Sequence, residues 1–213
     1  MLYVDMIQAV LVRAKGCPEF EAVDAMRNAC IEFCITTRFL TEGTQVIVDG
    51  TEVDLSSFDH MVLDVIEARV ADKLIRVTYM NDADLDTLDP TEYALTFADP
   101  NHGELTPAPT IAAPVVLDMI LSYAPGPSSN EVPDLLWLRN SEALKHGALY
   151  RLLAEPGKSW SDPKLSGYYS GLFMLAMEKM AADLGRNRQT TGRRMRARPV
   201  ETPTRRFSVR SLF

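Results

Sequence analysis

The stretch LKHGALYRLLAEPGKSWSDP, residues 144–163, decides much of the fold, because it holds the end of one helix, a break and the start of another. Apolar residues precede the break at helical spacing: Trp137, Leu144, Ala148 and Leu152. The helix is expected to end at Pro156-Gly157, since proline cannot continue it. Asp162-Pro163 then predicts a cap and a first-turn proline of a second helix. Its expected apolar stripe is Leu165, Tyr168, Leu172, Ala176, Met180 and Leu184, before Gly185.

The N-terminal segment has the same helical period. A first amphipathic helix is predicted before Gly16 from the spacing of Ile7, Val10, Leu11 and Ala14. A second helix is predicted to begin near Pro18 and to run to about Phe39. Its apolar face would be formed by Val23, Met26, Cys30 and Phe33.

Between residues 43 and 131 the apolar period changes from helical to alternating. Alternation marks several half-buried strands: Val46 and Val48, then Ile75, Val77 and Tyr79, then Tyr93, Leu95 and Phe97, then Val115 to Tyr123. The turn-rich segment 125–130 ends the last of them. We therefore predict an α+β fold: a four-helix body of two N-terminal and two C-terminal helices, with an inserted antiparallel β-rich domain and an extended C-terminal tail.

The predicted domains are a helical body of residues 1–42 plus 132–185, a β-rich insert of residues 43–131, and an arginine-rich C-terminal extension of residues 186–213. The formal net charge of −7 is unevenly distributed. The extension holds nine arginines and one glutamate, so it carries +8 and the remaining 185 residues carry −15. Charge separated on this scale indicates two surfaces with two different partners.

No apolar run reaches the roughly 18 residues of a membrane span, and Asp5 lies where a signal peptide would be positive. We expect a soluble protein made in a cytoplasm. The three cysteines are an odd number, and Cys30 and Cys34 share one helix face. We assign this pair to the core and expect no disulfide framework.

The sequence offers little for catalysis. His60, His102 and His146 are far apart, and the chain contains no GxSxG, P-loop or HExxH motif. Asp99, His102 and Glu104, around Gly103, could ligate a cation, but a polar hairpin turn explains them better.

Further candidates also have a simpler structural explanation. Four carboxylates, Asp82, Asp84, Asp86 and Asp89, could form an acid/base set, although a solvated connection before Pro90 explains them better. His146 is expected to be a packed structural group. If the chain were a cell-wall hydrolase, it would need a carboxyl group with a shifted pKa in a cleft, such as that of Glu104 or Glu131. We predict a protein that is not an enzyme and uses no cofactor.

The extension has three possible roles: docking to a protein, binding nucleic acid, or solvation. Arginine without lysine favours bidentate contacts to carboxylate or phosphate. Apolar residues at the terminus favour a protein groove, since nonspecific phosphate binding needs no such anchors. The predicted docking residues are Arg193, Arg194, Arg196, Arg198, Arg205, Arg206, Phe207, Arg210 and Phe213.

Residues 144–163, followed by Leu165, Tyr168, Tyr169 and Phe173, resemble the closing helix pair of tailed-bacteriophage head-to-tail adaptor, or head completion, proteins, also called portal connectors. The shared pattern is a GAL-x-RLL helix, a PGK-x-W turn and an aromatic-bearing last helix. The predicted order of elements is also similar, including a Tyr-x-Pro turn at Tyr123–Pro125. The specific part covers about residues 130–175.

The resemblance implies a virion structural protein at the neck between capsid and tail. Its copies would form a dodecameric ring that docks on the portal and extends the DNA channel toward the tail. The implied partners are the portal protein, neighbouring copies and a downstream tail or nozzle protein. DNA would pass through the channel without sequence-specific binding. The alternatives are a nucleic-acid-binding protein that uses the extension and, as a weaker candidate, a cell-wall hydrolase.

Overall fold

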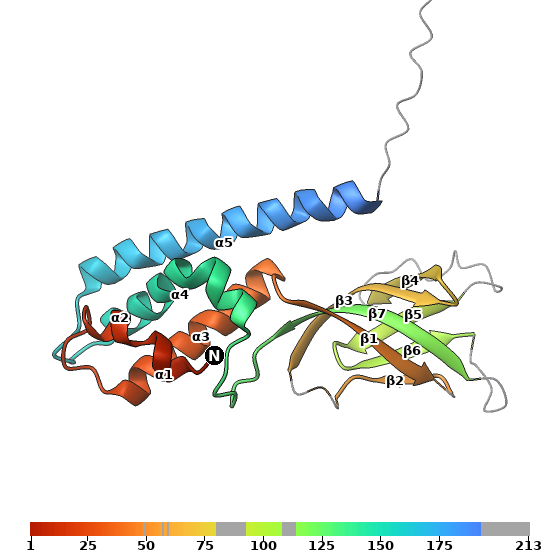
Figure 1. Ribbon diagram of the computed structural model, residues 1–213, viewed down its shortest axis with the longest axis horizontal. Helices are drawn as coiled ribbons and strands as arrows, with labels where there is room; N and C mark the ends of the chain where they lie inside the picture. The colour runs from red at the N-terminus through yellow and green to blue at the C-terminus, as the bar shows by residue number, and fades with distance from the viewer. Residues whose placement is uncertain (49, 57, 59, 80–92, 108–113, 193–213) are drawn as a thin grey trace, which may run out of the picture.

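The computed structural model describes residues 1–48, 50–56, 58, 60–79, 93–107 and 114–192 (Figure 1). It shows a mixed α+β fold with five helices and a seven-stranded, nearly closed sheet in this described part. The helices and the sheet form two lobes side by side, and each lobe has its own cluster of buried apolar residues. Strands β1, β3 and β7 run from the sheet lobe toward the helices (Figure 1).

The helices are α1 (Tyr3–Met6), α2 (Gln8–Leu11), α3 (Glu19–Thr37), α4 (Asp134–Ala154) and α5 (Pro163–Gly192). Helix α3 packs against α4 and α5, and the rings of Phe33 and Phe173 lie 6.3 Å apart between them. The cap predicted before α5 is confirmed, because Asp162 Oδ1 accepts a hydrogen bond from the Leu165 N–H at 3.0 Å. Helix α3 ends where Arg38 adopts a left-handed conformation, with φ 53°.

The strands are β1 (Thr41–Val48), β2 (Glu52–Asp54), β3 (Met61–Val70), β4 (Lys73–Tyr79), β5 (Ala94–Asp99), β6 (His102–Thr106) and β7 (Val115–Ala124). Their order across the sheet is β1-β7-β3-β4-β5-β6-β2. Neighbours are antiparallel except β4 and β5, which are parallel. The two end strands, β1 and β2, also contact each other, so the sheet curls into a nearly closed barrel around Leu95, Phe97 and Leu117.

The predicted four-helix body with an inserted antiparallel domain is wrong. Where one N-terminal helix was expected, the chain forms α1 and α2, with Ile7 between them. Bonds from Val10 N–H to Ile7 O and from Arg13 N–H to Val10 O span only three residues, which is the tighter pattern of short helical turns. Helix α5 also continues beyond Gly185, its expected end.

The sheet has more strands than the alternation predicted, and it is not purely antiparallel. Strand β3 was missed because its buried residues, Val62, Val65 and Ala68, are spaced by three. Register shifts at Val62/Asp64 and Val65/Glu67 keep all three side chains facing inward, so β-bulges replaced the expected period of two. The predicted domain boundaries stay a prediction. Among the described residues, no helix is long and apolar enough to cross a membrane.

Candidate functional site

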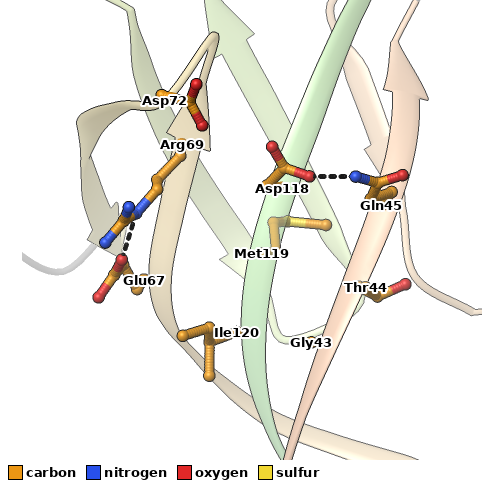
Figure 2. A pocket seen from close by; sticks show the side chains of 9 residues that line it. All are labelled: Gly43, Thr44, Gln45, Glu67, Arg69, Asp72, Asp118, Met119 and Ile120. Carbon is orange, nitrogen blue, oxygen red and sulfur yellow. Dashed lines mark hydrogen bonds and ion pairs between the residues drawn. The ribbon is translucent and has the colours of Figure 1, made fainter.

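A shallow hollow lies on the outer face of the sheet, where β1, β7 and β3 are neighbours (Figure 2). It is lined by Gly43, Thr44, Gln45, Glu67, Arg69, Asp72, Asp118, Met119 and Ile120. Gln45 Nε2 donates a hydrogen bond to Asp118 Oδ1 at 2.6 Å, which ties β1 to β7. Arg69 Nε contacts Glu67 Oε1 at 2.5 Å along β3.

The hollow combines charged side chains with apolar ones on the neighbouring strands. Its lining residues include no Ser, Cys, His or Lys, so they offer none of the commonest nucleophiles and no imidazole base. Exposed apolar side chains lie on the same strands, among them Ile47 at 71% exposure, Val116 and Ile120. Apolar groups beside paired charges are typical of a protein-binding surface.

The predicted polar hairpin turn is present between Asp99 and His102, which close the β5–β6 connection, whereas Gly103 lies within β6. The Asp99 carboxylate accepts hydrogen bonds from the backbone N–H groups of Asn101 and His102, at 2.8 and 3.1 Å. The bond from the Asn101 N–H, followed by a hydrogen bond from the His102 side chain, holds the Asp99 pKa below its usual value. Glu104 lies opposite Glu52 on β2 and belongs to the exposed outer face. In the described part of the chain, His, Cys, Asp and Glu form no group suited to a metal ion.

His146 is a packed residue of α4, as expected. Its ring stacks on Tyr169 of α5 at 5.5 Å between centroids, and partial burial lowers its pKa. It lies in a groove shared with Val12 and Arg13 at the end of α2. Among the described residues that line this groove, His146 is the one imidazole and the Tyr169 phenol is the one hydroxyl, and none of them is a cysteine.

The assignment of Cys30 and Cys34 to the core is confirmed, since both thiols are free and completely buried. Burial raises the pKa of Cys34 to about 12, and it raises the pKa of Cys30 further. Both thiols therefore remain protonated and inert at neutral pH.

The other candidates are not brought together. Glu104 lies on β6, whereas Glu131 lies beside the N-terminus of the helical lobe in a bridge with Leu2. The four carboxylates Asp82, Asp84, Asp86 and Asp89 lie outside the described residues. The same holds for every predicted docking residue of the extension: Arg193, Arg194, Arg196, Arg198, Arg205, Arg206, Phe207, Arg210 and Phe213.

Helix α5 presents an apolar face to solvent that the sequence did not reveal. Tyr168 was expected in the buried stripe, yet it is 61% exposed, and Met174 and Leu175 are exposed about two turns further along the helix. The side chains that pack inward are those of Tyr169, Phe173 and Met177. Apolar residues occur all around the first half of the helix, more than one buried stripe can hold. This excess could have indicated from the sequence that some of them are exposed.

A second feature that sequence reasoning missed is a polar cluster between α3 and α4. Glu32 Oε2 accepts a hydrogen bond from the Tyr150 hydroxyl at 3.0 Å and also pairs with the Arg151 guanidinium. Arg151 additionally donates to the Gly147 carbonyl at 3.3 Å. These partly buried groups satisfy one another, which indicates a structural role within the helical lobe.

No protein-family model matches the chain, and no curated protein is similar to it at a significant level.

Proposed function

We propose that the chain is a virion structural protein, a head-to-tail adaptor whose copies form a ring that docks on the portal and extends the DNA channel toward the tail. The observation that carries this proposal is the exposed apolar face of α5, formed by Tyr168, Met174 and Leu175. The same helix leads into the arginine-rich extension. Helix α5 thus carries an apolar face suited to contacts between copies, and it continues into a positive segment suited to a negatively charged partner.

A closed ring needs two different surfaces on each subunit, because the front of one copy meets the back of the next. The α5 face supplies one such surface. A second is available at the start of α4, where Leu135 and Leu138 are exposed, Leu138 at 78%. Contact between copies would bury the apolar area of both surfaces, which a single chain leaves exposed to water. This burial would favour association.

The charge distribution supports the rest of the proposal. A body of −15 suits a channel wall, because it repels DNA phosphates that must pass through. The +8 extension suits bidentate contacts to carboxylates on the portal. In this proposal the arginines and terminal apolar residues predicted from the sequence dock on the portal or on a neighbouring copy. The adaptor works by assembly in the neck of the virion, without catalysis or a cofactor.

The remaining partners in the proposal are neighbouring copies in a dodecameric ring and a tail or nozzle protein below it. The alternative function is nucleic-acid binding, which the positive charge of the extension favours. Charge reversal separates the two. Arg193→Glu with Arg194→Glu should abolish capture of the full chain by cognate portal rings, whereas the matched pair Lys15→Glu with Lys73→Glu, at exposed positions away from α5, should not.

Tight, salt-steep binding of DNA by the full chain, with no capture by portal rings, would instead establish the nucleic-acid function.

A further inference from the structure

Among the residues that the structure describes, none pairs with the outer edge of β1. Strand β1 pairs with β7 along its whole length, from Thr41 opposite Ser122 to Val48 opposite Val115. No other strand in the described part of the chain pairs with it, because it ends the order of the sheet. Strand β2 contacts β1 but is three residues long and pairs with β6.

The hydrogen-bond pattern shows which backbone groups face this edge. The Tyr123 N–H donates to the Leu40 carbonyl at 3.2 Å, so these opposite residues form a hydrogen-bonded pair. Such pairs alternate along an antiparallel ladder. The even-numbered residues of β1 therefore bond to β7, and Thr41, Gly43, Gln45 and Ile47 direct their N–H and C=O groups outward to the open edge.

Strand β1 lacks the features that normally protect an edge. Natural edge strands are short, bulged, or carry lysine or proline. At the opposite end of the sheet β2 follows this rule, since it is short and exposes Glu52 and Asp54. Strand β1 has eight residues in regular register, one acidic residue, and no lysine or proline. It is therefore a ready template for an added strand.

We propose that the C-terminal segment of a second copy, residues 205–213, adds to the outer edge of β1 as a further strand. Its sequence, RRFSVRSLF, alternates large apolar with polar residues through Phe207, Ser208, Val209 and Arg210. This is the period of a strand with one apolar face, and nine residues match the eight of β1.

The side chains on the two faces of β1 complement this segment. Val46 faces the barrel interior but stays half-buried, so Phe207 and Val209 could cover it. On the outer face, Arg206 and Arg210 would lie near Asp118, which is one strand away from the edge. The contact also joins a segment of positive charge to a body of −15.

The donor is a second copy because the proposed ring requires a contact that always runs in one direction. A segment given by one copy and received by the next is such a contact, and it closes into a ring. The connecting residues 193–204 can span about 40 Å when extended. They also include Arg193–Arg198, which this arrangement leaves available to the portal. The inference thus rests on the proposed function.

The test uses full-length chains that carry one added cysteine each. Gly43→Cys, at the open edge, is mixed with Ser208→Cys and treated with a short bismaleimide, alone at high concentration and with portal rings. A covalent heterodimer is expected, because each chain provides one reactive thiol while the native thiols are buried. The matched control replaces Gly43→Cys by Phe20→Cys, an exposed site on α3, and should give no heterodimer.

A second variant tests the backbone bonds themselves. Gln45→Pro in the receiving chain removes an outward N–H, which an edge strand tolerates, and should abolish the heterodimer, whereas Gln45→Ala should keep it. The inference is overturned if no heterodimer forms under either condition, or if Phe20→Cys gives an equal yield. It is also overturned if a chain that carries both Gly43→Cys and Ser208→Cys is linked solely within itself. Portal capture without the heterodimer overturns this inference alone, and the heterodimer without portal capture overturns the portal assignment alone.

Discussion

Gly147 of α4 lies directly against Phe173 of α5: a Cβ at Gly147 would stand 2.8 Å from Phe173 Cε2 and 2.8 Å from the Cβ of Ala29. Three helices therefore meet at one position where no side chain fits. The same glycine opens the GAL-x-RLL pattern of α4, so close packing explains why glycine stands there.

The Gly147→Ala variant should lower the free energy of unfolding by about 1–3 kcal/mol, because overpacking forces Ala29 or Phe173 to move. Gly171→Ala on α5 is the matched control, since no described atom lies within 4 Å of its Cβ position. There alanine should stabilise the helix by up to about 1 kcal/mol. Chemical denaturation checks both, and equal effects at the two sites would contradict the packing account.

The β3–β4 turn holds Ala71 and Asp72 at positive φ, 48° and 64°. Two left-handed residues form a type I′ turn, in which alanine is strained and asparagine is preferred. Ala71→Asn should raise the free energy of unfolding by about 0.5–1 kcal/mol, and Ala71→Val should lower it by about 1–2 kcal/mol. Thermal melting of the three proteins should follow that order, and a valine variant as stable as the parent would exclude the turn.

The buried thiols predict a pH dependence on the alkaline side. Burial raises the folded pKa of Cys34 from 9.0 to about 12, so the folded state keeps a proton that the unfolded state loses. This contribution is complete below pH 9 and is lost as pH rises from 9 toward 12, at most about 1.4 kcal/mol per pH unit for each thiol. Urea denaturation between pH 8 and 10 should show the decline, and Cys34→Ala should reduce its slope. A slope unaffected by Cys34→Ala would contradict this assignment.

The exposed face of α5 predicts a variant that folds but does not assemble. Leu175→Glu should change the free energy of unfolding by less than about 0.5 kcal/mol, because the side chain is 63% exposed. It should nevertheless prevent ring formation on the portal, since it removes an apolar side chain from the contact between copies and places a charge there. Ala154→Glu, an equal change of charge at an exposed site of α4, is the control. Rings of normal stoichiometry with Leu175→Glu, seen by negative-stain microscopy, would exclude this face from the interface.

Local signals in the sequence predicted the closing helix pair well. The break after Ala154 and the start of α5 follow from Pro156 and from the Asp162 cap, which act within a few residues of their own position. The sheet was harder to predict because its geometry depends on distant partners. Two bulges in β3 give its buried residues a spacing of three, which alternation cannot detect.

The candidate surfaces were predicted only in part. The face of α5 was assigned by spacing alone, and Tyr168 and Tyr169 differ by one position, a distinction that depends on where α3 and α4 lie. Gly103 was assigned to a turn, yet it lies within β6, where its missing side chain makes room for the Phe97 ring. Which strand edge remains open could not be predicted, because it depends on the order of the whole sheet.

The most direct test of the central claim is mass photometry of the purified full chain with cognate portal rings, at moderate and at high salt. The proposed adaptor should form a complex with about one copy per portal subunit, and this complex should weaken as salt screens the arginine contacts. A chain ending at Gly192, which retains all of α5, should stay folded and remain unbound. A full chain that ignores the portal at both salt concentrations while it binds DNA would contradict the adaptor function.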